Sequence, residues 1–321
     1  MFSDRDQRRR RIRNWIRWCA LSLALVATTA ASNGDLDTSV GIQTDGAYGA
    51  RSSGSLRSWD GSGAFARPSS RSGLRRVTAQ FPGAAGEALR VSYDVDAVAA
   101  RESMQAFGLV QGEIRALENA CRATKGCSQA ELDRAILGYY QSHDLRLTMR
   151  PGQRPRLFID IPQVVRRNRD AVRPVADALR ELGAQRGGDD AWLMDAAIAL
   201  VQTGLEYRQP SDVENGRHTL GFYTPGRALE QGFGDCDTKS ALLAAILTDL
   251  GQSGLVGVRV PGHYLLGVER EPKPGDAFVT WQGRRFVLIE AAGPAHRPPG
   301  QVSDRTRAAI DAREPMRIDP I

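Results

Sequence analysis

The sequence predicts an α+β protein whose folded region spans residues 87–321. Capped helical patterns dominate residues 87–189, and alternating strand patterns follow a long apolar helix within residues 190–295. The composition, with 41% hydrophobic and 25% charged residues, is ordinary for a globular protein. It excludes a collagen-like chain, a disulfide mini-scaffold and a polytopic membrane protein.

The positive charge of the chain lies in its N-terminal part. The formal net charge is +6; residues 1–31 carry +5 and residues 32–86 carry +2, so residues 87–321 carry −1. Phosphate-backbone binding requires a basic surface on the folded domain, because counterion release supplies most of its affinity. We therefore expect no nucleic-acid partner.

Residues 1–31 are predicted to be an export signal. An arginine-rich start precedes a short apolar stretch, and Thr29, Ala30 and Ala31 provide small residues for cleavage. The uncharged run over residues 18–31 has fourteen residues, whereas a membrane-spanning helix needs about 20. The alternative is an uncleaved anchor that associates with the membrane. In both cases we expect the rest of the chain in the periplasm or another extracytoplasmic compartment, tethered to the inner membrane in the second case.

Residues 32–86 are rich in Gly, Ser and Arg and show no sustained apolar periodicity. Such a segment buries too little apolar surface to offset the loss of backbone entropy on folding. We predict a flexible linker that ends at residue 86. At the other end of the chain, residues 296–321 are predicted to be a Pro-rich tail with a short helix over residues 303–312 and no assigned function.

Residues 87–189 are predicted to form a helical region. A helix over residues 113–121 is followed by a turn, and Ser128 with Glu131 forms a capping box for a second helix that runs toward Tyr140. Further elements of the scaffold are a short strand over residues 157–161 and helices over residues 170–182 and 189–205.

Cys121 and Cys127 flank the turn of this helical hairpin. In an oxidising compartment, two cysteines so close in sequence predict a local disulfide, worth about 2 kcal/mol by loop entropy. The alternative is a pair of buried free thiols. Removal of Cys19 with the signal leaves an odd number of cysteines, so a disulfide here makes Cys236 a free thiol.

Cys236 follows a glycine-rich loop and begins a predicted helix. Apolar residues recur after it at helical spacing, at positions 242, 243, 246, 247 and 250. The unpaired N–H groups and positive dipole of a helix N-terminus favour a thiolate and can donate hydrogen bonds to an oxyanion. The position therefore indicates a nucleophile with a lowered pKa, whereas a structural cysteine would lie within the apolar stripe.

His263 opens an alternating segment over residues 263–269 that predicts a strand. A predicted hairpin about Gly283 follows, and Glu290 comes directly after its second strand. The hairpin strands span residues 277–282 and 285–289. The order Cys236, His263, Glu290 is that of a nucleophile, a general base and an orienting carboxylate. The alternative is a structural histidine at the start of a strand.

These segments resemble the transglutaminase-like superfamily, and within it the bacterial transglutaminase-like cysteine peptidases. The resemblance covers residues 190–295 and rests on three motifs: G-D-C-D-T-K-S at 234–240, G-H-Y at 262–264 and F-V-L-I-E at 286–290. It implies a papain-like core, in which a cysteine-bearing helix packs on an antiparallel sheet, preceded here by the helical region.

The resemblance also implies site residues. The matching cysteine is the nucleophile, Cys236; the matching histidine is the base, His263; and the acidic residue that orients the histidine is Glu290. The family more usually has Asp at this third position. Because Glu290 is one methylene longer, its carboxylate requires a slightly displaced backbone to reach the imidazole.

Other side chains near Cys236 have weaker assignments. Tyr223 is a candidate for a second oxyanion donor, with a packed core tyrosine as the alternative. Asp235 and Asp237 are interpreted as helix-start charges and not as cation ligands, so we expect no metal or other cofactor. Lys239 follows one turn after Cys236 and either lowers the pKa of the thiol or is simply solvated.

The leading hypothesis is an exported cysteine hydrolase, a peptidase or amidase that cleaves an amide of a protein or peptide substrate through an acyl-enzyme. Water competes well at an open extracytoplasmic site, which favours hydrolysis. The first alternative is acyl transfer from glutamine to an amine, as in a true transglutaminase. The second is a catalytically inactive interaction module of the cell envelope. Cys236 and His263 argue against the second, because a binding module needs neither.

Overall fold

The computed structural model describes residues 73–83, 85–149 and 155–321. The predicted signal and most of the predicted linker lie outside the described residues. The chain divides into two compact units. In one of them the described residues belong to the hairpin of β3 (Leu145–Thr148) and β4 (Arg156–Ile159), and the other unit holds the remaining elements.

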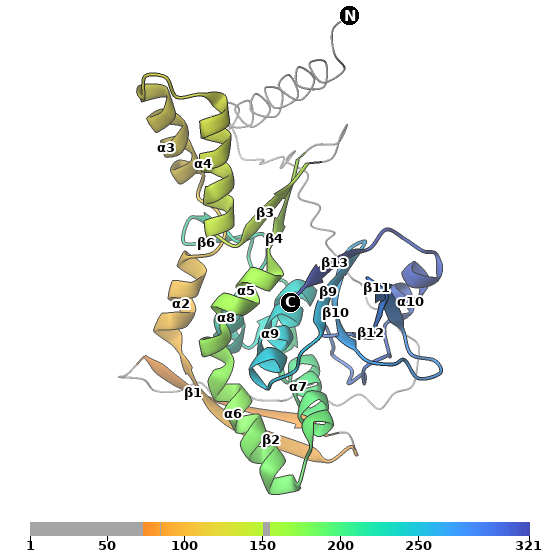
Figure 1. Cartoon of the computed structure of the whole chain (residues 1–321). Helices are drawn as coiled ribbons and strands as arrows, with labels where there is room; N and C mark the ends of the chain where they lie inside the picture. The colour runs from red at the N-terminus through yellow and green to blue at the C-terminus, as the bar shows by residue number, and fades with distance from the viewer. Residues whose placement is uncertain (1–72, 84, 150–154) are drawn as a thin grey trace, which may run out of the picture. The chain divides into compact units, whose positions relative to one another are not determined.

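The fold is mixed α+β, as the sequence predicts (Figure 1). The helices of the larger unit are α2 (Ala97–Gln105), α3 (Gln111–Ala123), α4 (Gln129–Ser142), α5 (Ile161–Arg167), α6 (Arg169–Arg186), α7 (Asp190–Gly204), α8 (Pro225–Gln231), α9 (Cys236–Asp249) and α10 (Asp304–Asp311). Its strands are β1 (Leu74–Pro82), β2 (Ala88–Asp96), β5 (Glu206–Tyr207), β6 (Val213–Glu214), β7 (Arg217–His218), β8 (Phe233–Gly234), β9 (Leu255–Val260), β10 (His263–Glu269), β11 (Phe278–Trp281), β12 (Arg284–Ile289) and β13 (Arg317–Pro320).

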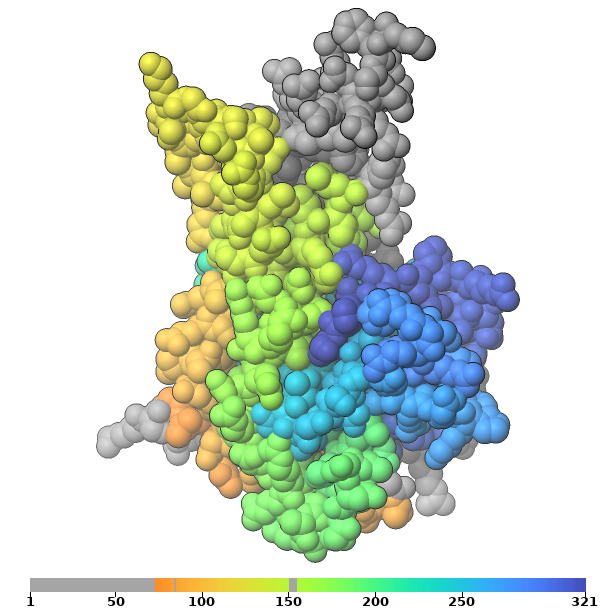
Figure 2. Space-filling view, in the orientation of Figure 1, coloured from red at the N-terminus to blue at the C-terminus, as the bar shows by residue number. Residues whose placement is uncertain are grey.

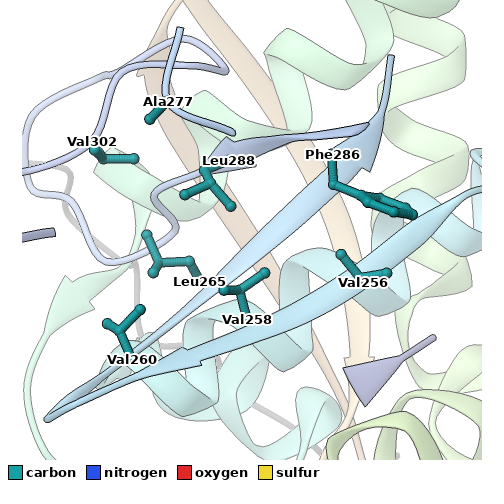
Figure 3. Close-up of a cluster of buried hydrophobic side chains, with 8 residues drawn as sticks. All are labelled: Val256, Val258, Val260, Leu265, Ala277, Phe286, Leu288 and Val302. Carbon is teal, nitrogen blue, oxygen red and sulfur yellow. The ribbon is translucent and has the colours of Figure 1, made fainter. Parts of the chain in front are cut away.

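A curled antiparallel sheet of five strands, in the order β11-β12-β10-β9-β13, forms the C-terminal part of this unit. A cluster of buried apolar side chains lies on one face of this sheet (Figure 3). Its members are Val256, Val258, Val260, Leu265, Ala277, Phe286, Leu288 and Val302. Ile310 of α10 and Ile318 of β13 pack against this cluster, so the last segments of the chain contribute to this core.

Helix α9 lies at the centre of the larger unit. It contacts α5, α6, α7, α8 and β10, and residues 238–247 are all buried. On the face shown in Figure 2, the cyan surface of α9 lies between the green surface of α6 and the blue surface of the sheet. Alternate residues of β10, which include Tyr264 and Leu266, are buried on the face of the sheet toward α9. Because α9 is mainly apolar and rich in Ala and Leu, other elements can pack against all of its faces.

Several predicted elements are confirmed together with their local geometry. At the start of α4, Ser128 Oγ accepts from the N–H of Glu131, whose carboxylate accepts from the Ser128 N–H, so the capping box is present. The β11–β12 hairpin turns at Gln282 and Gly283, both with positive φ, as a two-residue type I′ turn requires. The helices predicted over residues 170–182, 189–205 and 303–312 correspond to α6, α7 and α10.

The prediction of a flexible linker up to residue 86 is wrong at its C-terminal end. Strand β1 pairs antiparallel with β2 along its whole length, and its alternate side chains, which include Val77 and Phe81, are buried. Because β2 follows, the predicted helical region over residues 87–189 also begins with a strand and contains the β3–β4 hairpin. Apolar residues at every second position of β1 and β2 carry this signal in the sequence.

The predicted C-terminal tail is also part of the folded structure. Strand β13 forms the edge of the five-stranded sheet, where Ile318 pairs with Val258 of β9. Asp319 of this strand is buried. The boundary predicted at residue 295 therefore divides elements that share one sheet.

Cys121 and Cys127 lie at disulfide-bonding distance, with their Cα atoms 5.4 Å apart, as the sequence predicts. The bond spans the turn between α3 and α4. In the described part of the chain, no helix combines the length and the apolar character needed to cross a membrane.

Candidate active site

Cys236 is the first residue of α9, where the loop from α8 enters the centre of the fold. Asp235 is the N-cap, and its carboxylate accepts a hydrogen bond from the Thr238 N–H at 3.0 Å. Gly234 is required immediately before this cap, because a Cβ at that position would lie 2.4 Å from a methyl carbon of Thr238. The cap leaves the N–H groups of Cys236 and Asp237 as first-turn donors that it does not use.

His263 and Glu290 come together on neighbouring strands. His263 begins β10, and the β10–β12 register pairs Leu266 with Ile289, which places Glu290 opposite Leu265. The distance from His263 Nε2 to Glu290 Oε1 is 2.6 Å. The longer side chain of Glu290 therefore reaches the imidazole, and Nδ1 is the ring nitrogen left to exchange a proton with another group.

The sulfur of Cys236 lies against the start of β10. The thiol donates to Asp237 Oδ1 at 3.6 Å, and the backbone N–H of Tyr264, the residue after His263, interacts favourably with the sulfur. Within the described residues, no hydrogen bond joins this sulfur to the His263 ring. The structure thus forms the predicted His–Glu contact and places the residue after His263 near the Cys236 sulfur, while a Cys–His hydrogen bond is not formed among the described residues.

The expectation of a lowered thiol pKa is not met in this arrangement. Burial raises the pKa of Cys236 well above its ordinary value, and the carboxylates of Asp237 and Asp235 raise it further. The Tyr264 N–H opposes this shift without reversing it. Burial and the neighbouring Asp237 also raise the pKa of Asp235 to about 7. Burial, together with the two carboxylates, therefore outweighs the helix N-terminus, and Cys236 rests as a neutral thiol.

Replacing Asp237 by Asn is expected to make Cys236 more reactive. The change removes a negative charge beside the sulfur and leaves Arg259, which lies 3.5 Å from Asp237, without that counter-charge. A thiol pKa lowered by about one unit raises the thiolate fraction, and with it the alkylation rate at pH 7, about tenfold. The rate is measured with iodoacetamide across pH by intact mass. Asp304→Asn, in the first turn of α10, is the matched control, and an unchanged or slower rate in Asp237→Asn contradicts the assignment.

Tyr223 lies two residues before the start of α8 and is fixed close to the cysteine helix. Its N–H donates to Thr238 Oγ1 at 3.2 Å, and its ring packs 5.3 Å from the Phe233 ring. The Arg227 guanidinium lies over the ring, 5.6 Å from its centroid. In the described part of the chain its hydroxyl makes no hydrogen bond to the Cys236 sulfur, so its role as an oxyanion donor stays a prediction.

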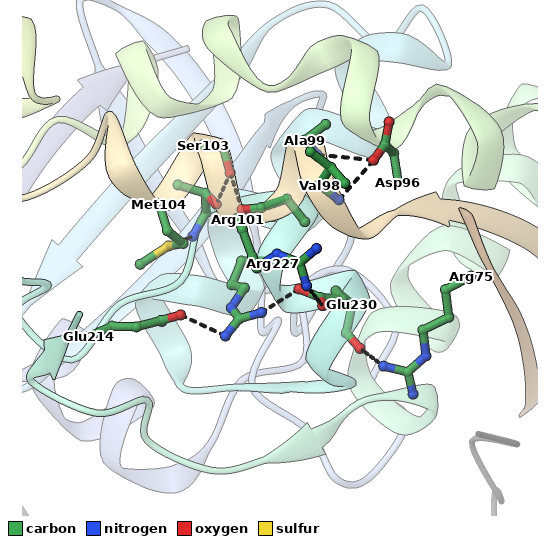
Figure 4. A network of polar contacts seen from close by, with 12 residues as sticks. Arg75, Asp96, Val98, Ala99, Arg101, Ser103, Met104, Glu214, Arg227 and Glu230 are labelled. Atoms are coloured by element: carbon green, nitrogen blue, oxygen red, sulfur yellow. Dashed lines mark hydrogen bonds and ion pairs between the residues drawn. The ribbon is translucent and has the colours of Figure 1, made fainter. Parts of the chain in front are cut away.

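A polar network holds α8 and so positions the loop that leads to Cys236 (Figure 4). Arg227 forms ion pairs with Glu214, at 2.6 Å, and with Glu230. Arg75 of β1 donates to the Glu230 carbonyl at 2.6 Å. Because α8 ends only a few residues before Cys236, the first strand of the larger unit helps to fix the candidate nucleophile.

Two buried side chains behind the site have roles that the sequence did not predict. Lys239 is neither solvated nor beside the thiol; it is fully buried and donates to three backbone carbonyls. Gln202 of α7 is also fully buried and donates to the Glu290 carbonyl at 2.5 Å. The position of Lys239 within the apolar stripe of α9, three residues before Leu242 and seven before Ile246, is a signal of burial that the sequence contains.

Comparison of the chain with models of known protein families, with curated proteins and with solved structures found no match. Among the described residues, no group of three or more His, Cys, Asp or Glu side chains is arranged to hold a metal ion. The function is therefore inferred from the arrangement of Cys236, His263 and Glu290.

Proposed function

We propose that this protein is a cysteine hydrolase, a peptidase or amidase of the transglutaminase-like type, with Cys236, His263 and Glu290 as its catalytic triad. The observation that carries the proposal is the 2.6 Å contact between His263 and Glu290 beside a cysteine at the start of a buried helix. A helix that bears this cysteine and packs on an antiparallel sheet also supports a papain-like core as the finer description of the fold.

The chemistry follows from the two nitrogens of the imidazole. Glu290 accepts from Nε2–H and so favours the tautomer in which Nδ1 is the acceptor. As Cys236 Sγ bonds to the substrate carbonyl carbon, its proton passes to His263 Nδ1. When the carbon–nitrogen bond breaks, the imidazolium returns this proton to the departing amine. Water then attacks the thioester with His263 as base, which releases the acid and restores the thiol.

The raised thiol pKa determines how this proton moves. Because Cys236 rests as a neutral thiol, proton transfer to His263 accompanies the attack and does not precede it. The N–H groups of Cys236 and Asp237 that the Asp235 cap leaves unused are the donors we propose for the oxyanion. Their fixed position at the helix N-terminus supplies preorganised stabilisation of the developing negative charge.

The cysteine chemistry also supports our proposal of an exported protein. Cys121 and Cys127 are paired at the tip of an exposed helical hairpin, where an oxidising compartment favours the disulfide. Cys236 is free and half-buried, as a nucleophile requires. We propose that the substrate is a protein or peptide.

Acyl-enzyme formation is the direct test of this function. Purified protein is mixed with p-nitrophenyl acetate; we expect a burst of nitrophenolate and an acetyl group on Cys236 that mass spectrometry locates. Cys236→Ser and His263→Ala should remove the burst, because one lacks the thiol and the other lacks the base. Unacetylated Cys236 in the intact protein would contradict the enzyme proposal and favour an interaction module.

One further reaction distinguishes water from a primary amine as the acceptor of the acyl group. Casein is incubated with the protein in the presence and absence of a fluorescent primary amine. New peptide termini without incorporated amine support hydrolysis. Incorporation of the amine into casein glutamines would instead favour a true transglutaminase.

A further inference from the structure

Lys239 is a buried cation that the proposed mechanism does not use. It lies one turn after Cys236 on α9, is fully buried, and burial lowers its pKa to about 7 while the negative charge of Glu290 opposes the decrease. Burying an ammonium costs free energy unless its donors are satisfied and its charge is offset. A neutral apolar residue of similar length would fill the same space at lower cost.

The three acceptors of Lys239 belong to two segments that flank the triad. Its Nζ donates to the carbonyls of Gln202 and Leu205 at the C-terminal end of α7, each at 3.1 Å, and to the carbonyl of Ala292 at 2.7 Å. Ala292 lies only two residues after Glu290. The ammonium therefore ties the end of α7 to the segment that carries the triad carboxylate.

Gln202 makes a second connection between the same two segments. Its amide donates to the carbonyls of Glu290 and Arg297, and its oxygen accepts from the Arg297 N–H at 2.9 Å. Gly293 has positive φ, and a Cβ there would lie 2.0 Å from the Gln202 carbonyl oxygen, so this chain segment passes in close contact with α7. The backbone from the Glu290 carbonyl to Arg297 is thus held from α7 and α9.

The Glu290 carboxylate itself uses only one of its oxygens in a hydrogen bond. Oε1 contacts His263, whereas Oε2 is buried and has no partner among the described residues. Burying a carboxylate with one unpartnered oxygen beside the imidazole is costly unless a nearby charge offsets it, and its position also depends on the backbone that carries it. Lys239 acts on both, since its charge interacts with Glu290 and its hydrogen bonds hold Ala292.

We infer that Lys239 is a positioning residue of the triad: its buried ammonium holds the Glu290 carboxylate against His263 and so sets the imidazole tautomer. This inference rests on the proposed function. It assigns the lysine an action through Glu290 and His263, and not a direct effect on the thiol.

The experiment reads the tautomer of His263 directly. Long-range ¹H–¹⁵N spectra of the labelled full chain distinguish Nε2–H from Nδ1–H imidazoles, and His263→Ala identifies the signal among the four histidines. We expect an Nε2–H tautomer in the unaltered protein and its loss or mixing in Lys239→Met. Lys125→Met is the matched control, because Lys125 is exposed in the helical hairpin.

The acylation rate of Cys236 provides the second readout. A displaced base costs about 100-fold in rate, so Lys239→Met should slow acetylation by this order. In a Glu290→Gln background, Lys239→Met should change the rate by less than about twofold, because both act through the same interaction. Lys239→Gln, which keeps amide donors without the charge, serves if Lys239→Met does not fold.

Each outcome has one meaning. An unchanged tautomer in the folded Lys239 variants would overturn the inference, and so would effects that multiply in the double variant. An Nδ1–H tautomer in the unaltered protein would contradict the triad and overturn the inference with it, because Lys239 is argued to act through the contact of Nε2–H with Glu290. If the unaltered protein shows the Nε2–H signal but Cys236 is not acylated, the proposed hydrolase is refuted. Loss of that signal in Lys239→Met would still support the positioning role.

Discussion

Replacing Glu290 by Gln is expected to lower the rate of Cys236 acylation by about 10⁴-fold with little change in fold. The amide has the same shape as the carboxylate but also carries donors, so it stabilises the wrong imidazole tautomer. His263 Nδ1 then holds a hydrogen and cannot accept the proton of a thiol whose pKa burial has already raised.

The rate is measured as nitrophenolate release from p-nitrophenyl acetate, with unfolding followed by circular dichroism. Glu269→Gln is the matched control, because Glu269 ends the same strand that His263 begins and pairs with Arg284 at the surface. Glu290→Asp should fall between the two, since it keeps the charge but shortens the reach. Full activity in Glu290→Gln would show that the histidine needs no orienting carboxylate and would contradict the triad.

Gly257→Ala is expected to destabilise the fold by about 3 kcal/mol. A Cβ at this position of β9 would lie 1.8 Å from the hydroxyl oxygen of Tyr264 on the neighbouring strand. Tyr264 is fully buried, and its hydroxyl donates to Asp319 of β13 at 3.3 Å, so the ring has no free direction in which to move. The methyl group must therefore displace a strand of the central sheet.

The free energy of unfolding is measured by urea titration. Gly138→Ala in α4 is the control with the opposite sign, because no atom lies within 4 Å of its new methyl group and alanine favours a helix by about 1 kcal/mol. Tyr264→Phe should restore part of the stability of Gly257→Ala, since it removes the atom in closest contact. Equal stability of Gly257→Ala and the unaltered protein would refute the close packing of β9 and β10.

Local signals predicted the elements on which the candidate site depends. The capping box of Ser128 and Glu131, the turn at Gly283 and the apolar run after Cys236 each involve residues a few positions apart, and each formed as expected. The predicted domain boundaries were wrong where a strand pairs with a segment that is distant in the sequence. Strand β13 contains a proline and two charged residues, and only its pairing with β9 makes it a strand.

By itself the sequence determined the mixed α+β class, the disulfide pair, the helix that begins at Cys236 and the order of the three candidate triad residues. The tertiary structure alone decided the contact of His263 with Glu290, the burial of Lys239 and the raised pKa of the thiol. The physical reason is range: caps, turns and periodicity act between neighbours in sequence. Burial and charge act through whatever the fold brings near, here α7, α9 and the segment after Glu290.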